Sequence, residues 1–219
     1  ESIARYHLLK HPFYQAWSKG ELSLKTLQIY AAQYYHQVSA FPRFVSRVHS
    51  ECPEISARKI LLENLIDEEI HGTDHPELWM KFAHGLGVSR DTVNKTSPFI
   101  ETQAMVHKYH ELAARDWRAG LVALYAYESQ VPAVSASKID GLKQHYGITD
   151  HETLAFFDAH QLYDIKHSEQ VAGLITCYAD QEDDACHAAH EASLVLKEGS
   201  SSWPSGSRSG WSPFEGGRR

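Results

Sequence analysis

The stretch from His160 to His167 places three potential metal ligands on one face of a helix. His160, Asp164 and His167 are four and three residues apart, which on an α-helix brings them within about 60° of one another. Two imidazoles and a carboxylate suit iron or manganese, and zinc less distinctively, whereas calcium and magnesium rarely take histidine. The alternative is a solvated polar face, so the metal hypothesis requires matching ligands elsewhere in the chain.

A second set of candidates surrounds Glu68. The periodicity predicts one continuous helix in which a buried leucine stripe changes to a carboxylate and an imidazole at Glu68 and His75. Gly72, between them, would permit the close approach of another helix. His71 competes with His75, because Glu68 and His71 have the Glu-x-x-His spacing of ferritin-like di-iron bundles. Periodicity alone leaves both histidines open.

Glu128 is a single acid in an otherwise apolar and aromatic segment. A glutamate in such surroundings is usually paired, neutral or bound to a metal. The alternative is an ordinary salt bridge at a helix end close to Pro132. The combined candidates are three carboxylates and three histidines, enough to hold two metals and leave positions open for oxygen. They are Glu68, His75, Glu128, His160, Asp164 and His167.

Composition predicts one ordinary globular domain. The chain has 219 residues, of which 42% are hydrophobic and 22% charged. Acidic residues number 28 against 21 basic ones, and no basic stripe accumulates, so nucleic acid and anionic membranes are poor partners. The three cysteines lack paired spacing, which argues against a disulfide framework. No apolar run approaches the ~18 residues of a membrane span, and we expect a cytoplasmic protein.

The elements that must position these residues are helices, because apolar residues recur at helical spacing almost throughout the chain. Ser23 is expected to cap a long helix that passes through Pro42, and Thr149 to cap the helix that carries the central stretch. We predict an all-α bundle of seven or eight helices, formed by a single domain at 1–198. From 199 to 219 the composition shifts to Ser, Gly, Arg and Pro, which predicts a disordered or artificially added tail.

Four stretches of the sequence resemble the sequence motifs of a known family. They are His11-Pro12-Phe13-Tyr14, Gln33-Tyr34-Tyr35-His36, Tyr127-Glu128-Ser129-Gln130 and the His160-x3-Asp164-x2-His167 pattern. From about Tyr6 to Tyr178 the chain resembles the haem-oxygenase-like di-metal oxidases. Within that superfamily it is similar to the Chlamydia protein associating with death domains and its bacterial relatives, which make para-aminobenzoate for folate. More distantly it resembles the pyrroloquinoline-quinone synthases and the TenA-like proteins.

The resemblance implies a haem-oxygenase-like fold and a role for particular residues. The metal ligands of the family fall on the six candidates above, which selects His75 over His71. The cofactor would be dinuclear iron or mixed iron and manganese, used with O2 and an external reductant. The family is held to build para-aminobenzoate from its own tyrosine, matching Tyr14, with Lys138 as the amino donor. Each protein molecule would then turn over once, or nearly so.

Without the resemblance, the sequence predicts ordinary structural roles for Tyr14, Tyr30 and Lys138. Tyr14 and Tyr30 have helical spacing and would be core residues, and Lys138 would be a surface lysine. A lysine that donates nitrogen must be partly neutral, which burial near a metal could produce.

Further tyrosines lie within one turn of the proposed ligands and could relay a radical, namely Tyr125, Tyr127 and Tyr163. Phe156 departs from the pattern, because we expect a further tyrosine there in the relatives. A relay that used this position would be missing.

Three other functions remain open from the sequence. A sibling branch oxidises external fatty acids or amino-acid-derived substrates and would need an apolar channel to the metals. The thiamin-salvage hydrolases use a nucleophilic cysteine, and none of Cys52, Cys177 and Cys186 lies at the expected position. The third is an interaction protein that binds death domains. Aromatic content also suggests a homodimer.

Overall fold

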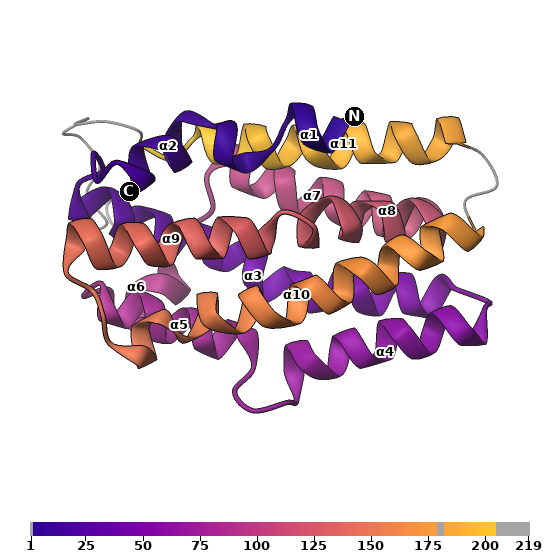
Figure 1. Cartoon of the computed structure of the whole chain (residues 1–219), viewed down its shortest axis with the longest axis horizontal. Helices are drawn as coiled ribbons and strands as arrows, with labels where there is room; N and C mark the ends of the chain where they lie inside the picture. Colours follow the sequence, from indigo (N-terminus) through magenta and orange to yellow (C-terminus); the bar gives the residue numbers. More distant parts are fainter. Residues whose placement is uncertain (1, 179–181, 205–219) are drawn as a thin grey trace, which may run out of the picture.

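The computed structural model describes residues 2–178 and 182–204, and these residues form helices without any strand (Figure 1). Eight helices in this part of the chain have at least 11 residues, which confirms the predicted all-α bundle of seven or eight helices. The remaining elements are short. In order, the elements are α1 (Ser2–Arg5), the 3-10 helix η1 (Leu8–Lys10), α2 (Pro12–Ser18), α3 (Leu24–Glu51), α4 (Ile55–Glu69), α5 (His75–Gly85), α6 (Arg90–Lys95), α7 (Ile100–Arg115), α8 (Trp117–Glu128), α9 (Val131–Tyr146), α10 (His151–Tyr178) and α11 (Glu182–Ser201).

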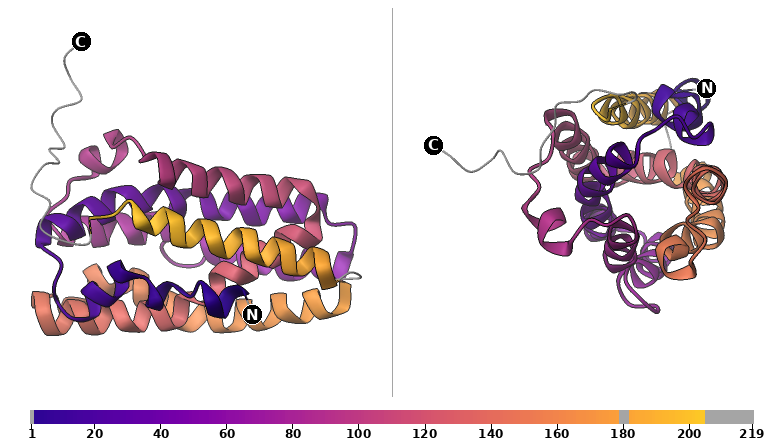
Figure 2. Two further views of the ribbon diagram at one scale, coloured as in Figure 1. Left: turned by 90° about the horizontal axis from the view of Figure 1, so that it is seen from above. Right: turned by 90° about the vertical axis from the view of Figure 1, so that its left-hand side faces the viewer.

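Two helices of 28 residues, α3 and α10, run most of the length of the bundle. Helix α3 packs against α4, α5, α7 and α8, and α10 packs against α4, α5, α8 and α9. Helix α11 lies on α7 and α8 with α1 beside it. Seen end-on, the helices surround a common interior (Figure 2). Side chains from α3, α4, α5, α8 and α10 can therefore meet at one place.

Local signals explain where the two long helices begin. The Ser23 hydroxyl accepts a hydrogen bond from the Thr26 backbone N–H, and α3 continues through Pro42, both as predicted. The expected cap of α10 was wrong by one residue. Asp150, which directly precedes the first helical residue His151, accepts from the Thr153 N–H at 2.8 Å in place of the expected Thr149 cap.

The surface of the described residues bears on two expectations. Among their exposed large apolar side chains, Tyr163 is the one aromatic ring, so aromatic exposure gives little support to a homodimer. No helix in the described ranges combines the length and apolar character that crossing a bilayer would require.

Helical structure continues beyond the predicted domain boundary at 198. Helix α11 continues to Ser201, and Trp203 after it is only 2% exposed. The Trp203 ring lies 4.8 Å from the Tyr30 ring and 5.1 Å from the Phe13 ring, measured between centroids. Sequence patterning missed this contact because one aromatic residue among glycines and serines has no periodicity. The expected tail from 205 to 219 lies outside the described residues.

We expect Trp203→Ala to lower the free energy of unfolding by about 3 kcal/mol, because it removes a buried aromatic ring and leaves a cavity. Denaturant unfolding followed by circular dichroism would measure the change. Ile55→Ala is the control, since that side chain is 65% exposed and its loss should change stability by under about 0.5 kcal/mol. Equal stability of Trp203→Ala and wild type would mean that the end of the chain does not contribute to the core.

Candidate metal centre

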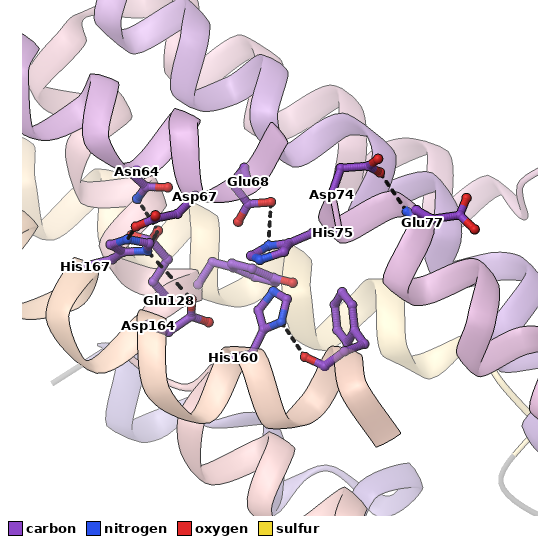
Figure 3. Close-up of polar contacts among 12 residues, drawn as sticks. Asn64, Asp67, Glu68, Asp74, His75, Glu77, Glu128, His160, Asp164 and His167 are labelled. Carbon is purple, nitrogen blue, oxygen red and sulfur yellow. Dashed lines mark hydrogen bonds and ion pairs between the residues drawn. The ribbon is translucent and has the colours of Figure 1, made fainter. Parts of the chain in front are cut away.

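The six predicted ligands converge in the interior of the bundle. Glu68 lies in the last turn of α4, His75 begins α5, Glu128 ends α8, and the remaining three follow one face of α10. Every one of the six is at most 4% exposed. Figure 3 shows their side chains pointing toward one another from these helices. The solvated-face alternative is therefore wrong for His160, Asp164 and His167.

The approach of Glu68 and His75 is produced by a turn. We expected one continuous helix through both residues, but α4 ends at Glu69 and α5 begins at His75. Gly72 between them has a φ of +72°, a backbone conformation that glycine adopts without steric cost. A Cβ at Gly72 would meet nothing within 4 Å, so this glycine permits the turn and not the close approach of a helix.

Glu68, His75 and His160 form the first half of the centre. Each contributes one potential ligand atom, and these atoms all lie within 4.8 Å of one another. His71 faces outward, with a side chain that is 64% exposed, and its Nδ1 pairs with Asp67 at 2.7 Å. The geometry thus favours His75 over His71 as a candidate ligand.

The second half is centred on His167. Its Nδ1 lies 3.9 Å from Asp164 Oδ1 and 4.0 Å from Glu128 Oε1. Its other ring nitrogen, Nε2, lies 2.8 Å from Asp67 Oδ2. With the proton on Nε2, the lone pair of Nδ1 faces both carboxylates, as a metal ligand should.

Three groups that orient the ligands were not identified from the sequence. Asp67 holds His167, and the Asn64 side-chain amide donates to Glu128 Oε1 at 2.6 Å. The Phe156 carbonyl accepts from His160 Nδ1 at 2.7 Å, which leaves His160 Nε2 as the free nitrogen. Asn64 lies four residues before Glu68 and Asp67 adjoins it, so polar residues beside a buried acid were the available signal.

The unsatisfied atoms of these side chains fit a bound cation. Glu128 Oε2, Asp164 Oδ2 and His167 Nδ1 are buried without a hydrogen-bond partner, which is costly for polar groups in an apolar interior. His75 Nδ1 lies 2.8 Å from Glu68 Oε2 but is not aligned as a hydrogen bond. Buried polar atoms that lie close together without hydrogen-bond partners are the arrangement that a cation relieves. A nitrogen and oxygen set of this kind suits iron, manganese or zinc.

Burial changes the proton affinities of the ligands. It raises the pKa of Glu128 to about 8, with the nearby Glu68 adding to the rise and the Asn64 hydrogen bond opposing it. It also raises the pKa of Asp164 well above its usual range. Burial and the neighbouring His75 lower the pKa of His160, so its imidazole is neutral. The carboxyl groups thus retain protons that a bound cation would displace.

A cluster of aromatic rings encloses the amine of Lys138. Its Nζ lies 5.3 Å from the ring centroid of Tyr14 and donates a hydrogen bond to Tyr30 Oη. Lys138 is only 4% exposed, so the expectation of a surface lysine is wrong, whereas Tyr14 and Tyr30 are core residues as their spacing predicted. Burial lowers the pKa of Lys138 to about 7. This amine is therefore substantially neutral near neutral pH.

The other predicted tyrosines occupy different positions around the centre. Tyr127 is buried, and its hydroxyl lies 2.8 Å from the Tyr34 hydroxyl. Tyr125 is half-buried, and Tyr163 is 41% exposed with its ring 6.4 Å from the His167 ring. At position 156, the phenylalanine ring packs 4.0 Å from the His160 ring.

Comparison with known proteins identifies relatives of the whole bundle. Residues 28–198 match a family described as iron-containing redox enzymes. The chain is 39% identical to a 4-aminobenzoate synthase of Chlamydia muridarum, over 89% of this chain and 83% of the relative. It is 41% identical to a 4-aminobenzoate synthase of Nitrosomonas europaea, over 81% and 76% of the two chains. A TenA homologue of Pseudomonas syringae has a similar fold, with a TM-score of 0.78, 16% identity and coverage of 90% and 86%.

We expect Asp164→Asn to stabilise the metal-free protein by about 1 kcal/mol or more, because the substitution removes a buried acid that lacks a partner for one oxygen. The same substitution should abolish most of the stabilisation by added Mn²⁺, which for wild type at 100 times the dissociation constant would be about 2.7 kcal/mol. Thermal unfolding with and without Mn²⁺ would measure both effects. Asp91→Asn is the control, since Asp91 is an exposed partner of Lys95. Destabilisation without metal, together with an unchanged Mn²⁺ response, would contradict the assignment.

The burial of Lys138 predicts a pH-dependent stability. Its pKa is about 7 in the folded protein and near 10.5 in the unfolded chain, so between these values the unfolded chain binds more protons. The contribution of Lys138 to stability should therefore rise with pH in this window, by up to about 1.4 kcal/mol per pH unit. Lys138→Met lacks this contribution, and its stability relative to wild type should be highest below pH ~7 and fall toward pH ~9.5.

Denaturant unfolding of the metal-free protein at several pH values would test this dependence. Lys95→Met is the matched control, because the side chain of Lys95 is 75% exposed. The stability difference between the control and wild type should not follow the same trend. A constant difference between Lys138→Met and wild type from pH ~6 to pH ~9.5 would show that the buried amine is not neutralised by folding.

Proposed function

This chain belongs to the family of iron-containing redox enzymes, and from that premise we propose that it is a 4-aminobenzoate synthase that consumes its own side chains. The relatives named 4-aminobenzoate synthase align with most of its length. The observation that carries the proposal is the buried amine of Lys138, which lies 5.3 Å from the Tyr14 ring within the same core as the candidate metal ligands. An amine beside a phenol ring supplies the two groups from which an aminated aromatic ring can be made.

We assign the aromatic ring of the product to Tyr14 and its nitrogen to Lys138. A nitrogen nucleophile needs a free lone pair, and the lowered pKa of Lys138 supports this role. The phenol oxygen of Tyr14 would be replaced by Lys138 nitrogen as the Nζ–Cε bond of the lysine breaks. The Cα–Cβ bond of Tyr14 would be cleaved and Cβ oxidised to the product carboxylate, with O2 as the oxidant. Because both groups are consumed, each molecule would turn over once, or nearly so.

We propose the six buried residues as ligands of two metal ions, iron or a mixture of iron and manganese. When bound, such a pair would supply the activation of O2, with electrons from an external reductant. The chain itself orients the ligands. Asp67 and the Phe156 carbonyl fix the ring nitrogens of His167 and His160, and Asn64 fixes Glu128. A reductant-dependent route to a folate precursor also fits a cytoplasmic location.

The alternative functions do not account for the burial of Tyr14, Lys138 and the six candidate ligands. An oxidase of an external substrate would assign no special role to Tyr14 or Lys138, although both are buried in contact with the same aromatic cluster. A protein that only binds death domains would not need six buried ionisable side chains, since their burial is unfavourable without compensation.

Mass spectrometry of protein and supernatant would test the proposal. Protein labelled with ¹⁵N-lysine and ring-¹³C-tyrosine is mixed with iron, manganese, reductant and air. Wild type should release 4-aminobenzoate that carries both labels and should lose the corresponding mass at Tyr14. Tyr14→Phe and Lys138→Arg should lower the yield by about 100-fold or more, because each removes a reacting group.

Tyr146→Phe and Lys95→Arg are the controls, because these residues of the same types lie outside the candidate metal centre and the Lys138 cluster, and we expect both to retain the wild-type yield. If wild type binds metals but releases no aromatic amine and keeps its mass, Tyr14 and Lys138 are scaffold residues. An external-substrate oxidase would then be the better interpretation.

A further inference from the structure

Tyr34 lies between the candidate metal centre and the Lys138 cluster. It is one helical turn after Tyr30 on α3, and it is buried. Its hydroxyl oxygen lies 2.8 Å from that of Tyr127, a residue that directly precedes Glu128. On its other side, its ring stacks on the Tyr30 ring, with centroids 5.3 Å apart and an angle of 26° between the planes.

The Tyr30 ring of this stack contacts the Lys138 cluster. Lys138 Nζ donates to Tyr30 Oη and lies 5.3 Å from the ring centroids of both Tyr14 and Tyr34. Tyr127, Tyr34 and Tyr30 thus form an unbroken series of contacts, one through a hydrogen bond and one through stacked rings. The series begins beside a proposed ligand and ends at the proposed substrates.

The neighbouring tyrosines do not provide the same connection. Tyr109 is buried with its ring 6.4 Å from the Tyr127 ring, but its hydroxyl has no hydrogen-bond partner among the described residues. Tyr163 lies at the exposed side of the centre. Among the described tyrosines, Tyr34 is thus the one whose hydroxyl is hydrogen-bonded to Tyr127.

We propose that Tyr34 is a relay residue that passes oxidation from Tyr127 to the Tyr30, Tyr14 and Lys138 cluster. The proposal takes its end point from the proposed function, whereas the relay step itself depends on Tyr127 and Tyr34 alone. Tyr34 is neither one of the six proposed ligands nor one of the two proposed substrates.

The transfer from Tyr34 to Tyr127 moves one electron and one proton across the hydrogen bond between them. Tyr127 would first give one electron and its phenolic proton together to the oxidant that a bound metal pair would generate from O2. Tyr34 then gives one electron and its hydroxyl proton to Tyr127 Oη, which restores neutral Tyr127 and leaves a neutral radical on Tyr34. A buried phenol cannot release its proton to water, so electron and proton must move together across the 2.8 Å contact. The oxidised ring is then the one stacked on Tyr30.

The test compares Tyr34→Phe with Tyr109→Phe in the full chain. Both remove one hydroxyl from a buried tyrosine next to Tyr127, but only the first removes a hydrogen bond to it. Each variant is mixed with iron, manganese, reductant and air and frozen at successive times. Electron paramagnetic resonance then follows the tyrosyl radical, with ring-deuterated tyrosine to identify it.

We expect Tyr34→Phe to trap the radical on Tyr127, with a lifetime about tenfold longer than in wild type. The double variant Tyr34→Phe with Tyr127→Phe should lose this signal. The yield of 4-aminobenzoate should fall about tenfold in Tyr34→Phe and stay near wild type in Tyr109→Phe. A second measurement uses the metal-free protein, in which Tyr34→Phe should lower the melting temperature more than Tyr109→Phe does, because it leaves the Tyr127 hydroxyl without a partner.

The same radical position and lifetime in Tyr34→Phe and wild type would overturn the relay. So would equal melting temperatures of the two metal-free variants, since the hydrogen bond would then be absent. The radical measurement decides the relay even if wild type releases no 4-aminobenzoate. Absence of 4-aminobenzoate release by wild type would count against the proposed function only.

Discussion

The arrangement of the bundle depends on the burial of three carboxylates and three imidazoles at one place. Such a set is unfavourable in an apolar interior, where each charge loses its hydration. Part of the cost is offset inside the chain by protons kept on Glu128 and Asp164 and by the neutral state of His160. The remainder is visible as carboxylate oxygens and an imidazole nitrogen without partners. Because Asp67, Asn64 and the Phe156 carbonyl fix side chains of this set, less conformational freedom would be lost when a cation binds.

The helices bring these six side chains together from positions near helix ends and from one face of α10. Glu68, His75 and Glu128 each stand at or beside a helix terminus, where a change of one residue would turn the side chain elsewhere. The φ of +72° at Gly72 turns the chain between the first two. Asp67 and Asn64 on α4 then hold side chains that come from α10 and α8. Orientation therefore comes from a second layer of contacts, and that layer joins three helices.

Sequence periodicity predicted the parts of the centre that lie on one element. His160, Asp164 and His167 share a face of α10 because their spacing matches the helical repeat. The approach of Glu68 to His75 was assigned to a continuous helix, since a left-handed glycine in a short turn leaves no periodic signal. The burial of Lys138 was beyond local patterning, because the rings around it come from α2, α3 and α10 and its own helix looks polar. The contribution of Trp203 was missed for the same reason.

The aromatic cluster links the energetics of the fold to the proposed chemistry. Rings that exclude water from Lys138 also lower its pKa, so packing and a neutral amine have one cause. In the proposed reaction the substrates are part of the chain and need no binding site, because folding already places the Lys138 amine 5.3 Å from the centre of the Tyr14 ring. Such fixed placement corresponds to very high effective concentrations, on the order of 10⁵ M or more for well-oriented groups. Dense packing around Tyr14 and Lys138, which would obstruct an external substrate, is then the feature that brings the two groups together.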